Sequence, residues 1–287
     1  MSRKGDRPSP GAAHGTPPEP PGPPVEFIAP GDPGDPAGTT DSTDSTRIDF
    51  VECPPPPLSA AERWAVDRHW AEATAANPTA FDGPLVAALG LDRPAPGRTV
   101  VRWARMTYRS RALRSLRPPG AVPGSVYVTV LLPTEEGLVL GRGSRTTATP
   151  GRWSLPGGGA EPPPPGQPLD LAVLRRHAAV ELAEEVGLVV RESELGLWAL
   201  TRGARFGSLG FHFLAPAVPA ARVRRCHAGL IAAETARGLV PELDELAFTA
   251  SDFERSDPDE SDAGKSAPAP GPCADYLPPL LARYRGH

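Results

Sequence analysis

Residues 153–188 decide the fold of this chain, and they read WSLPGGGAEPPPPGQPLDLAVLRRHAAVELAEEVGL. Apolar side chains in the second half recur at steps of three and four, at Leu171, Leu174, Ala178, Leu182 and Val186. This spacing predicts a helix with one buried face. Gly187 follows at the position where a helix commonly ends in the left-handed conformation. The stretch therefore combines a glycine run, a proline-rich interruption and an amphipathic helix.

Three carboxylates lie along one edge of the predicted helix. At 100° per residue, Glu181, Glu184 and Glu185 fall within an arc of about 100° beside the buried face. Like charges at this spacing cost a few tenths of a kcal/mol per pair, and the helix dipole disfavours them near the C-terminus. A hard divalent cation such as Mg²⁺ or Mn²⁺ would offset that cost. A solvated acidic face is the alternative, but the glycine run 157–159 favours a site, because backbone without side chains can approach a ligand or metal.

The same residues resemble the Nudix hydrolases, whose motif is G-x5-E-x7-R-E-U-x-E-E-x-G-U with U aliphatic. The stretch 153–161 is similar to the usual entry W-x-L-P-G-G-G-x-E, and 181–188 matches E-U-x-E-E-x-G-U at every position. Two departures stand out. Val180 occupies the place of the arginine, and the insertion Pro162–Pro168 leaves Ala172 where the first glutamate belongs.

The resemblance implies an α/β fold of the Nudix type, an α/β/α sandwich around a mixed sheet. It implies that Glu181, Glu184 and Glu185, with the backbone of Gly158, bind Mg²⁺ or Mn²⁺ and carry the catalysis. The implied activity is cleavage of a diphosphate linkage in a nucleoside diphosphate joined to another group, which makes a small nucleotide the expected partner. In the family the arginine orients a glutamate, so the change at Val180 keeps an alternative open: a nucleotide-binding regulator that no longer catalyses.

Further residues are candidates for binding substrate and for the base. Guanidinium groups form paired hydrogen bonds with phosphate, and four arginines follow predicted strands, at Arg142, Arg145, Arg202 and Arg205. In the family the base often comes from a late loop, and Glu242 and Glu245 lie in such a position. His212 alternates with apolar residues in a predicted strand, which favours a structural role.

An accessory strand-helix-strand segment is predicted over 46–118, before the main domain at 119–250. Strands are expected at 47–51 and 99–106, with a helix from Ser59 through Ala76 that begins with the capping box Ser59–Glu62. Trp64 and Trp70 are expected to pack this helix against the main domain. The motif 70–84 and the later 107–109 are similar to the extension that precedes the Nudix domain in UDP-sugar diphosphatases, which suggests a UDP-sugar substrate.

Composition bounds the remaining predictions. Residues 1–45 are rich in proline and glycine with few aliphatic side chains, so a disordered tail is predicted there, and another is predicted over most of 251–287. No apolar run approaches 18 residues and no signal peptide is evident, which favours a cytoplasmic protein without a membrane partner. A net charge of −4 gives no electrostatic reason to expect nucleic acid as a main partner.

Overall fold

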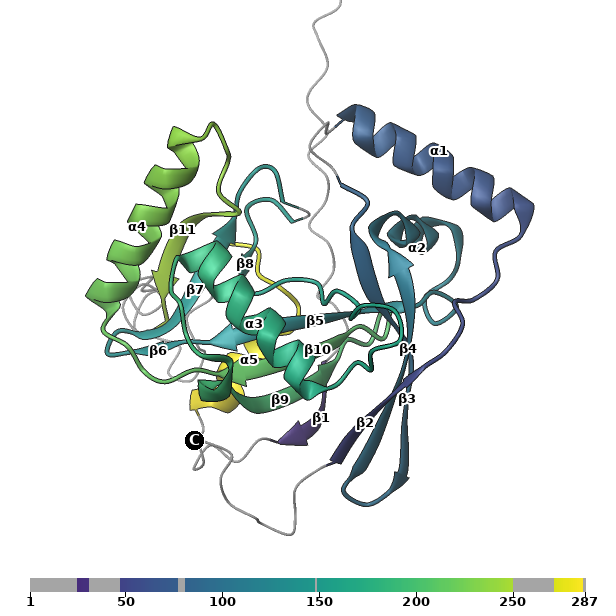
Figure 1. Cartoon of the computed structure of the whole chain (residues 1–287), viewed down its shortest axis with the longest axis horizontal. Coiled ribbons are helices and arrows are strands. Elements are labelled where there is room, and N and C mark those ends of the chain that lie inside the picture. Colours follow the sequence, from purple (N-terminus) through teal and green to yellow (C-terminus); the bar gives the residue numbers. More distant parts are fainter. Residues whose placement is uncertain (1–24, 31–46, 77–80, 148, 250–270, 286–287) are drawn as a thin grey trace, which may run out of the picture.

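The computed structural model describes residues 25–30, 47–76, 81–147, 149–249 and 271–285 (Figure 1). Its strands are β1 (Glu26–Pro30), β2 (Arg47–Glu52), β3 (Pro84–Ala95), β4 (Arg98–Thr107), β5 (Gly124–Leu131), β6 (Pro133–Thr134), β7 (Gly137–Gly143), β8 (Trp153–Ser154), β9 (Gly196–Arg202), β10 (Leu209–Leu214) and β11 (Leu243–Phe248). Its helices are α1 (Ala60–Ala76), α2 (Leu113–Leu116), α3 (Leu171–Val186), α4 (Ala220–Ala236) and α5 (Leu277–Arg285), with short 3-10 helices at Tyr108–Ala112 and Glu192–Glu194. Within these ranges no helix has the length and apolar character to cross a membrane.

A larger mixed sheet and a smaller antiparallel sheet form the scaffold. The larger has the order β1-β9-β10-β5-β3-β4-β2, and the smaller has β11-β7-β6 with β8 paired to β7. β10 runs parallel to β5 and β2 runs parallel to β4, whereas the other pairs in the larger sheet are antiparallel. The predicted α/β class with a mixed sheet is therefore confirmed.

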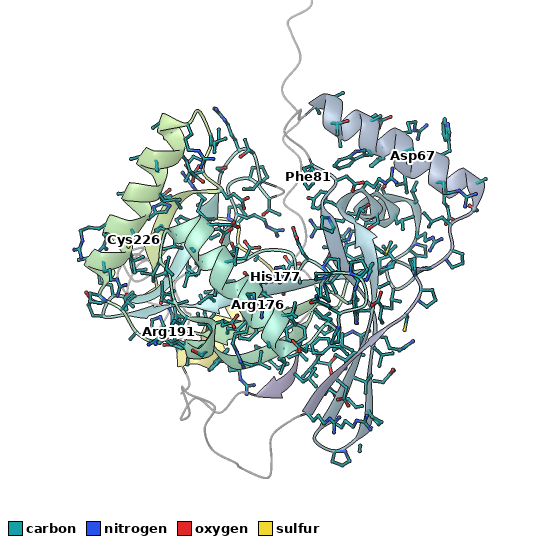
Figure 2. The ribbon with its side chains drawn as sticks, in the orientation of Figure 1. Asp67, Phe81, Arg176, His177, Arg191 and Cys226 are labelled. Atoms are coloured by element: carbon teal, nitrogen blue, oxygen red, sulfur yellow. The ribbon has the colours of Figure 1, made fainter. Side chains whose placement is uncertain are left out.

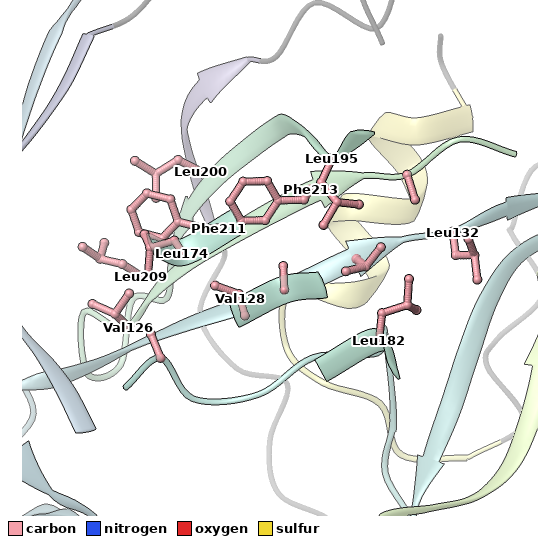
Figure 3. Close-up of a cluster of buried hydrophobic side chains, with 14 of the residues drawn as sticks. Val126, Val128, Leu132, Leu174, Leu182, Leu195, Leu200, Leu209, Phe211 and Phe213 are labelled. Atoms are coloured by element: carbon pink, nitrogen blue, oxygen red, sulfur yellow. The ribbon is translucent and has the colours of Figure 1, made fainter. Parts of the chain in front are cut away.

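Helix α3 packs on one face of β5 and matches its predicted bounds closely. It begins after Asp170, whose carboxylate accepts the Val173 N–H at 2.8 Å, and it ends at Gly187 with φ 73°. Its buried residues Leu174 and Leu182 share a core with Val126 and Val128 of β5 and with the aromatic side chains of β10 (Figure 3). The alternation along β5 directs every second residue, Val126, Val128 and Val130, into this core.

The proline insertion is not helical and leads into α3 as a loop, as predicted. Arg105 of β4 holds it through hydrogen bonds to the carbonyls of Pro163 and Pro164. The same guanidinium pairs with Glu52 of β2 at 2.8 Å. The insertion therefore connects the central loop to the accessory strands.

The opposite face of the sheet is covered by α5, and here the prediction of a mostly disordered C-terminal tail is wrong for residues 271–285. Leu277 and Leu280 are fully buried, in a core with Trp153 and Trp198. Leucines at 277, 280 and 281 have the spacing of one helical face. This helix supplies the second outer layer of the predicted sandwich.

The N-terminal prediction is also wrong for residues 26–30, which form β1 and pair with β9. The run around Phe27 and Ile28 is apolar enough to add a strand, because the two side chains alternate between the two cores. The rest of the predicted tail, 1–24 and 31–45, and the part of the second tail at 251–270 lie outside the described residues.

The accessory segment extends the central sheet. β2, α1 and β4 were predicted, and the capping box is confirmed, since Ser59 N–H donates to Glu62 at 2.8 Å and Glu62 N–H donates to Ser59 Oγ at 3.2 Å. β3 was not predicted, and it joins β4 to β5. Trp64 is 63% exposed, so the expectation that it packs on the main domain is wrong. That residues 46–118 form a separate unit stays a prediction.

Candidate active site

The glycine run lies along β5 as an additional extended segment. The N–H groups of Val130 and Val128 donate to the carbonyls of Pro156 and Gly158 at 2.8 and 3.0 Å. In return the Ala160 N–H donates to Val126 at 2.9 Å. These bonds fix the loop backbone against the sheet, directly beneath the carboxylates of α3. Gly158 keeps one carbonyl lone pair beyond its bond to Val128.

Two glycines of this run are required by close contacts. Gly157 has φ 146°, and a Cβ there would overlap the backbone of Val128 and Thr129. A Cβ at Gly158 would overlap the carboxylate of Glu181. Glycine therefore lets the loop touch both the strand below it and the helix carboxylate above it.

Glu185 is the buried member of the predicted carboxylate group. Only 6% of its surface is exposed, and its Oε2 accepts the Gly157 N–H at 2.6 Å. Burial raises the pKa of Glu185 well above its usual range, the Gly157 hydrogen bond opposes this, and the negative charge of Glu181 adds to it. The chain thus keeps a carboxyl group buried beside the glycine loop. Ionising this group costs free energy, which a bound cation would offset.

Glu181 lies between several acidic neighbours. Burial, followed in order by the charges of Glu242, Glu184 and Glu161, raises the pKa of Glu181 to about 7. Burial also raises the pKa of Glu242, together with the charges of Glu184 and Glu234. Glu184 is exposed at the outer edge of the group. The structure thus brings Glu242 into the same acidic group as the helix carboxylates.

Glu161 was not among the predicted site residues. It is the last residue of the motif W-x-L-P-G-G-G-x-E, so the sequence contained a signal for it. Because the proline insertion follows directly, its position relative to α3 could not be predicted. His177 of α3, labelled in Figure 2, lies near it, and burial lowers the pKa of His177 while Glu161 raises it.

The predicted arginines divide into two locations. Arg142 pairs with Asp244 at 3.1 Å and with Glu245 at 2.9 Å, so Glu245 is already engaged by a cation. Arg145 is exposed in the turn after β7. Arg202 and Arg205 flank the turn that packs against Gly124, at the start of β5. Their roles in binding substrate stay predictions.

His212 is structural, as expected. It is fully buried, and its two ring nitrogens contact Thr129 Oγ1 and Thr201 Oγ1, each at 2.7 Å. Burial lowers the pKa of His212 to about 3, so the ring is neutral. Both ring nitrogens are satisfied, which leaves no lone pair for a metal.

The carboxylates of this site fit a hard divalent cation in donor type. Within the described part of the chain, no three His, Cys, Asp or Glu side chains are arranged as a ready-made metal site. Mg²⁺ does not require one, because proteins usually bind it through one or two carboxylates, with waters and substrate phosphates completing the octahedron. Glu181 and Glu185, both of raised pKa and both touching the glycine loop, are the side chains that would hold it.

Arg175 and Arg176, one turn before Val180, are the candidates to replace the missing arginine, and Arg176 does not do so. Val180 is 46% exposed, and Arg176 pairs with Glu192 at 3.1 Å. Glu185 is instead oriented by the backbone N–H of Gly157. A hydrogen bond from fixed backbone to a carboxylate is charge-assisted, so loss of the arginine does not leave Glu185 unsupported.

The raised pKa of Glu181 predicts a pH-dependent stability. Its folded pKa of about 7 exceeds the ordinary 4.5, so the folded protein holds this proton more tightly than the unfolded chain does. The resulting stabilisation is present below pH 4.5 and is lost as the pH rises through about 7. Mg²⁺ binds the ionised form, so it should raise the melting temperature more at about pH 8 than at about pH 5.

The measurement is thermal unfolding in EDTA and in Mg²⁺ at the two pH values. Glu181→Gln is the control, since it removes one of the titrating carboxylates of the site and should reduce the difference between the two pH values. An Mg²⁺ effect in the parent protein that is equal at both pH values would contradict the assignment.

Comparisons with known proteins give little further information on the function of this site. No family model matches the sequence, and no curated protein matches it. Among solved structures, the chain is similar to the crystal structure of MutT protein from Methanosarcina mazei Go1, with a TM-score of 0.28 and 20% identity over 43% of this chain and 74% of that chain. A likeness of this size carries no part of the functional argument, which rests on the residues described above.

Proposed function

We propose that this chain is a metal-dependent hydrolase that cleaves a diphosphate linkage in a nucleoside diphosphate joined to another group. The observation that carries the proposal is the contact of two helix carboxylates, Glu181 and Glu185, with a glycine loop fixed on the sheet. The resemblance of residues 153–188 to the Nudix motif supports the same chemistry. A UDP-sugar is the substrate favoured by the resemblance of the accessory segment.

In this proposal each residue has a distinct task. Bound Mg²⁺ or Mn²⁺ would offset the charge of the diphosphate and polarise the attacking water. Glu185, held by Gly157, would anchor the cation from the buried side, while Glu181 and Glu184 would hold it from the open side. The bare backbone at 157–159 would let the phosphate approach without obstruction. No side chain needs to form a covalent intermediate.

Glu242 is the better of the two candidate bases. The pKa of Glu242 is raised toward neutral pH. A base whose pKa is near the working pH both accepts and releases a proton effectively. It lies close enough to Glu184 for their charges to interact. Glu245 pairs with Arg142 at 2.9 Å, so its carboxylate is engaged in an ion pair with β7.

The direct test is product analysis. The purified chain is incubated with a panel of nucleoside diphosphate compounds, UDP-sugars included, in Mg²⁺, in Mn²⁺ and in EDTA, and the products are identified by chromatography and mass spectrometry. We expect one class of compound to be split between its two phosphates, with no turnover in EDTA. Ligand binding in EDTA with no turnover in either metal would instead identify the nucleotide-binding regulator.

A further inference from the structure

Two arginines outside the carboxylate site have no anionic partner in the described part of the chain. Arg111 ends the 3-10 helix at Tyr108–Ala112, and Arg114 lies in α2. The Nε of each is buried and has no hydrogen-bond partner. Among the described residues, neither arginine belongs to an ion pair, although most arginines of this segment do.

The surroundings of this pair are aromatic and polar but not acidic. Arg111 lies over the ring of Tyr108 at 4.7 Å, and Arg114 lies over the ring of Phe206 at 4.8 Å. Arg114 Nη2 also donates to Ser125 Oγ at 3.1 Å. Burial, together with the positive charge of Arg111, lowers the pKa of Arg114 to about 10. Stacking thus places the two cations near each other without neutralising them.

A close contact between the turn after β9 and the start of β5 brings these side chains together. A Cβ at Gly124 would overlap Gly207 and Ser208, so glycine at 124 allows the turn after β9 to lie against the start of β5. The Ser125 N–H donates to Ser208 Oγ at 3.1 Å and fixes the turn there. This contact brings Phe206 beneath Arg114. Ser110, Arg111, Gly124 and Ser125 line a small recess at the same junction.

We propose that Arg111 and Arg114 form a phosphate-binding subsite between the accessory segment and the start of β5. A phosphoryl group supplies two negative charges and several acceptor oxygens, which match two adjacent guanidinium groups better than a single carboxylate does. The subsite does not depend on the proposed hydrolysis, and only its use by the same substrate rests on that function.

The subsite and the carboxylates lie beside different parts of β5. Glu185 meets the glycine loop beside Thr129, and Arg114 bonds Ser125, four residues away, or about 13 Å at ~3.3 Å per residue. A phosphate bound by the arginines is therefore a group distinct from one held at the carboxylates.

The experiment is calorimetric titration of the full chain with inorganic phosphate in EDTA, with chloride keeping the ionic strength constant. EDTA leaves the carboxylate site without a cation, so that site repels phosphate. We expect the parent protein to bind phosphate, and Arg111→Gln and Arg114→Gln to bind it at least about tenfold more weakly. The matched control is Arg68→Gln, which removes an exposed guanidinium of the same segment and should bind like the parent.

Arg114→Gln removes a contact to Ser125 and can lower stability, so Arg111→Gln decides the matter. Removing this charge relieves repulsion, and the melting temperature in chloride should stay unchanged or rise. Absence of phosphate binding in the parent, or binding by Arg111→Gln within about twofold of the parent, would overturn the proposal. UDP-glucose is then titrated in competition: displacement of phosphate assigns the subsite to the nucleotide substrate, and no displacement assigns it to free phosphate.

Discussion

Glu185→Gln is expected to fold normally and to lose at least about a hundredfold in kcat, or about 2.7 kcal/mol of transition-state stabilisation. Glutamine keeps the length of the side chain, and its carbonyl oxygen can still accept the Gly157 N–H. It lacks the negative charge that a cation requires. Since burial and the charge of Glu181 both raise the pKa of Glu185, the neutral amide should leave the metal-free protein equally stable or more stable.

Activity and stability therefore move in different directions in this variant. The measurements are kcat at saturating Mg²⁺ on the substrate identified by the panel, and thermal unfolding in EDTA. Glu184→Gln should also lose activity, whereas Glu72→Gln, an exposed carboxylate of α1, should lose none. If Glu185→Gln and Glu184→Gln keep rates within about threefold of the parent, these carboxylates do not hold a catalytic metal.

Leu280→Ala should destabilise the protein by about 3 kcal/mol, because it removes buried methyl groups and leaves a cavity. Leu280 is fully buried in the core between α5 and the sheet, together with Leu277 and Trp198. The measurement is urea denaturation followed by tryptophan fluorescence, to which Trp198 and Trp153 should both contribute.

The matched control for this variant is Val189→Ala, at a side chain that is 77% exposed. It should change the free energy of unfolding by no more than about 0.5 kcal/mol. A comparably small effect of Leu280→Ala would mean that α5 does not pack on the sheet in solution, and the sequence-based prediction of a disordered tail would stand for residues 271–285.

The difference between α3 and α5 shows what could be predicted from the sequence. Sixteen residues of α3 carry a complete periodic pattern with Asp170 and Gly187 at its ends, so local information defines the helix. α5 has nine residues and one apolar face, and its helical state depends on packing against strands far away in the sequence. The same holds for β1, whose partner β9 lies more than a hundred residues later.

The candidate site, like the fold, was only partly predictable from the sequence. Helical geometry placed Glu181, Glu184 and Glu185 on one edge, but it did not separate the buried Glu185 from the exposed Glu184. Glu161 joins the group only because the loop folds back along β5. The pairing of Arg142 with Asp244 likewise depends on β11 lying beside β7, a contact between distant segments that composition and spacing do not encode.

The positions of β1 and β2 at the two outer edges of the large sheet have a consequence for self-association. An outermost strand leaves unpaired backbone groups that can recruit a second chain, and proline blocks such pairing because it has no N–H to donate. β1 ends at Pro30, and β2 is followed almost directly by Pro54–Pro57. The short length of both strands and the prolines beside them thus protect the molecule against aggregation through strand addition.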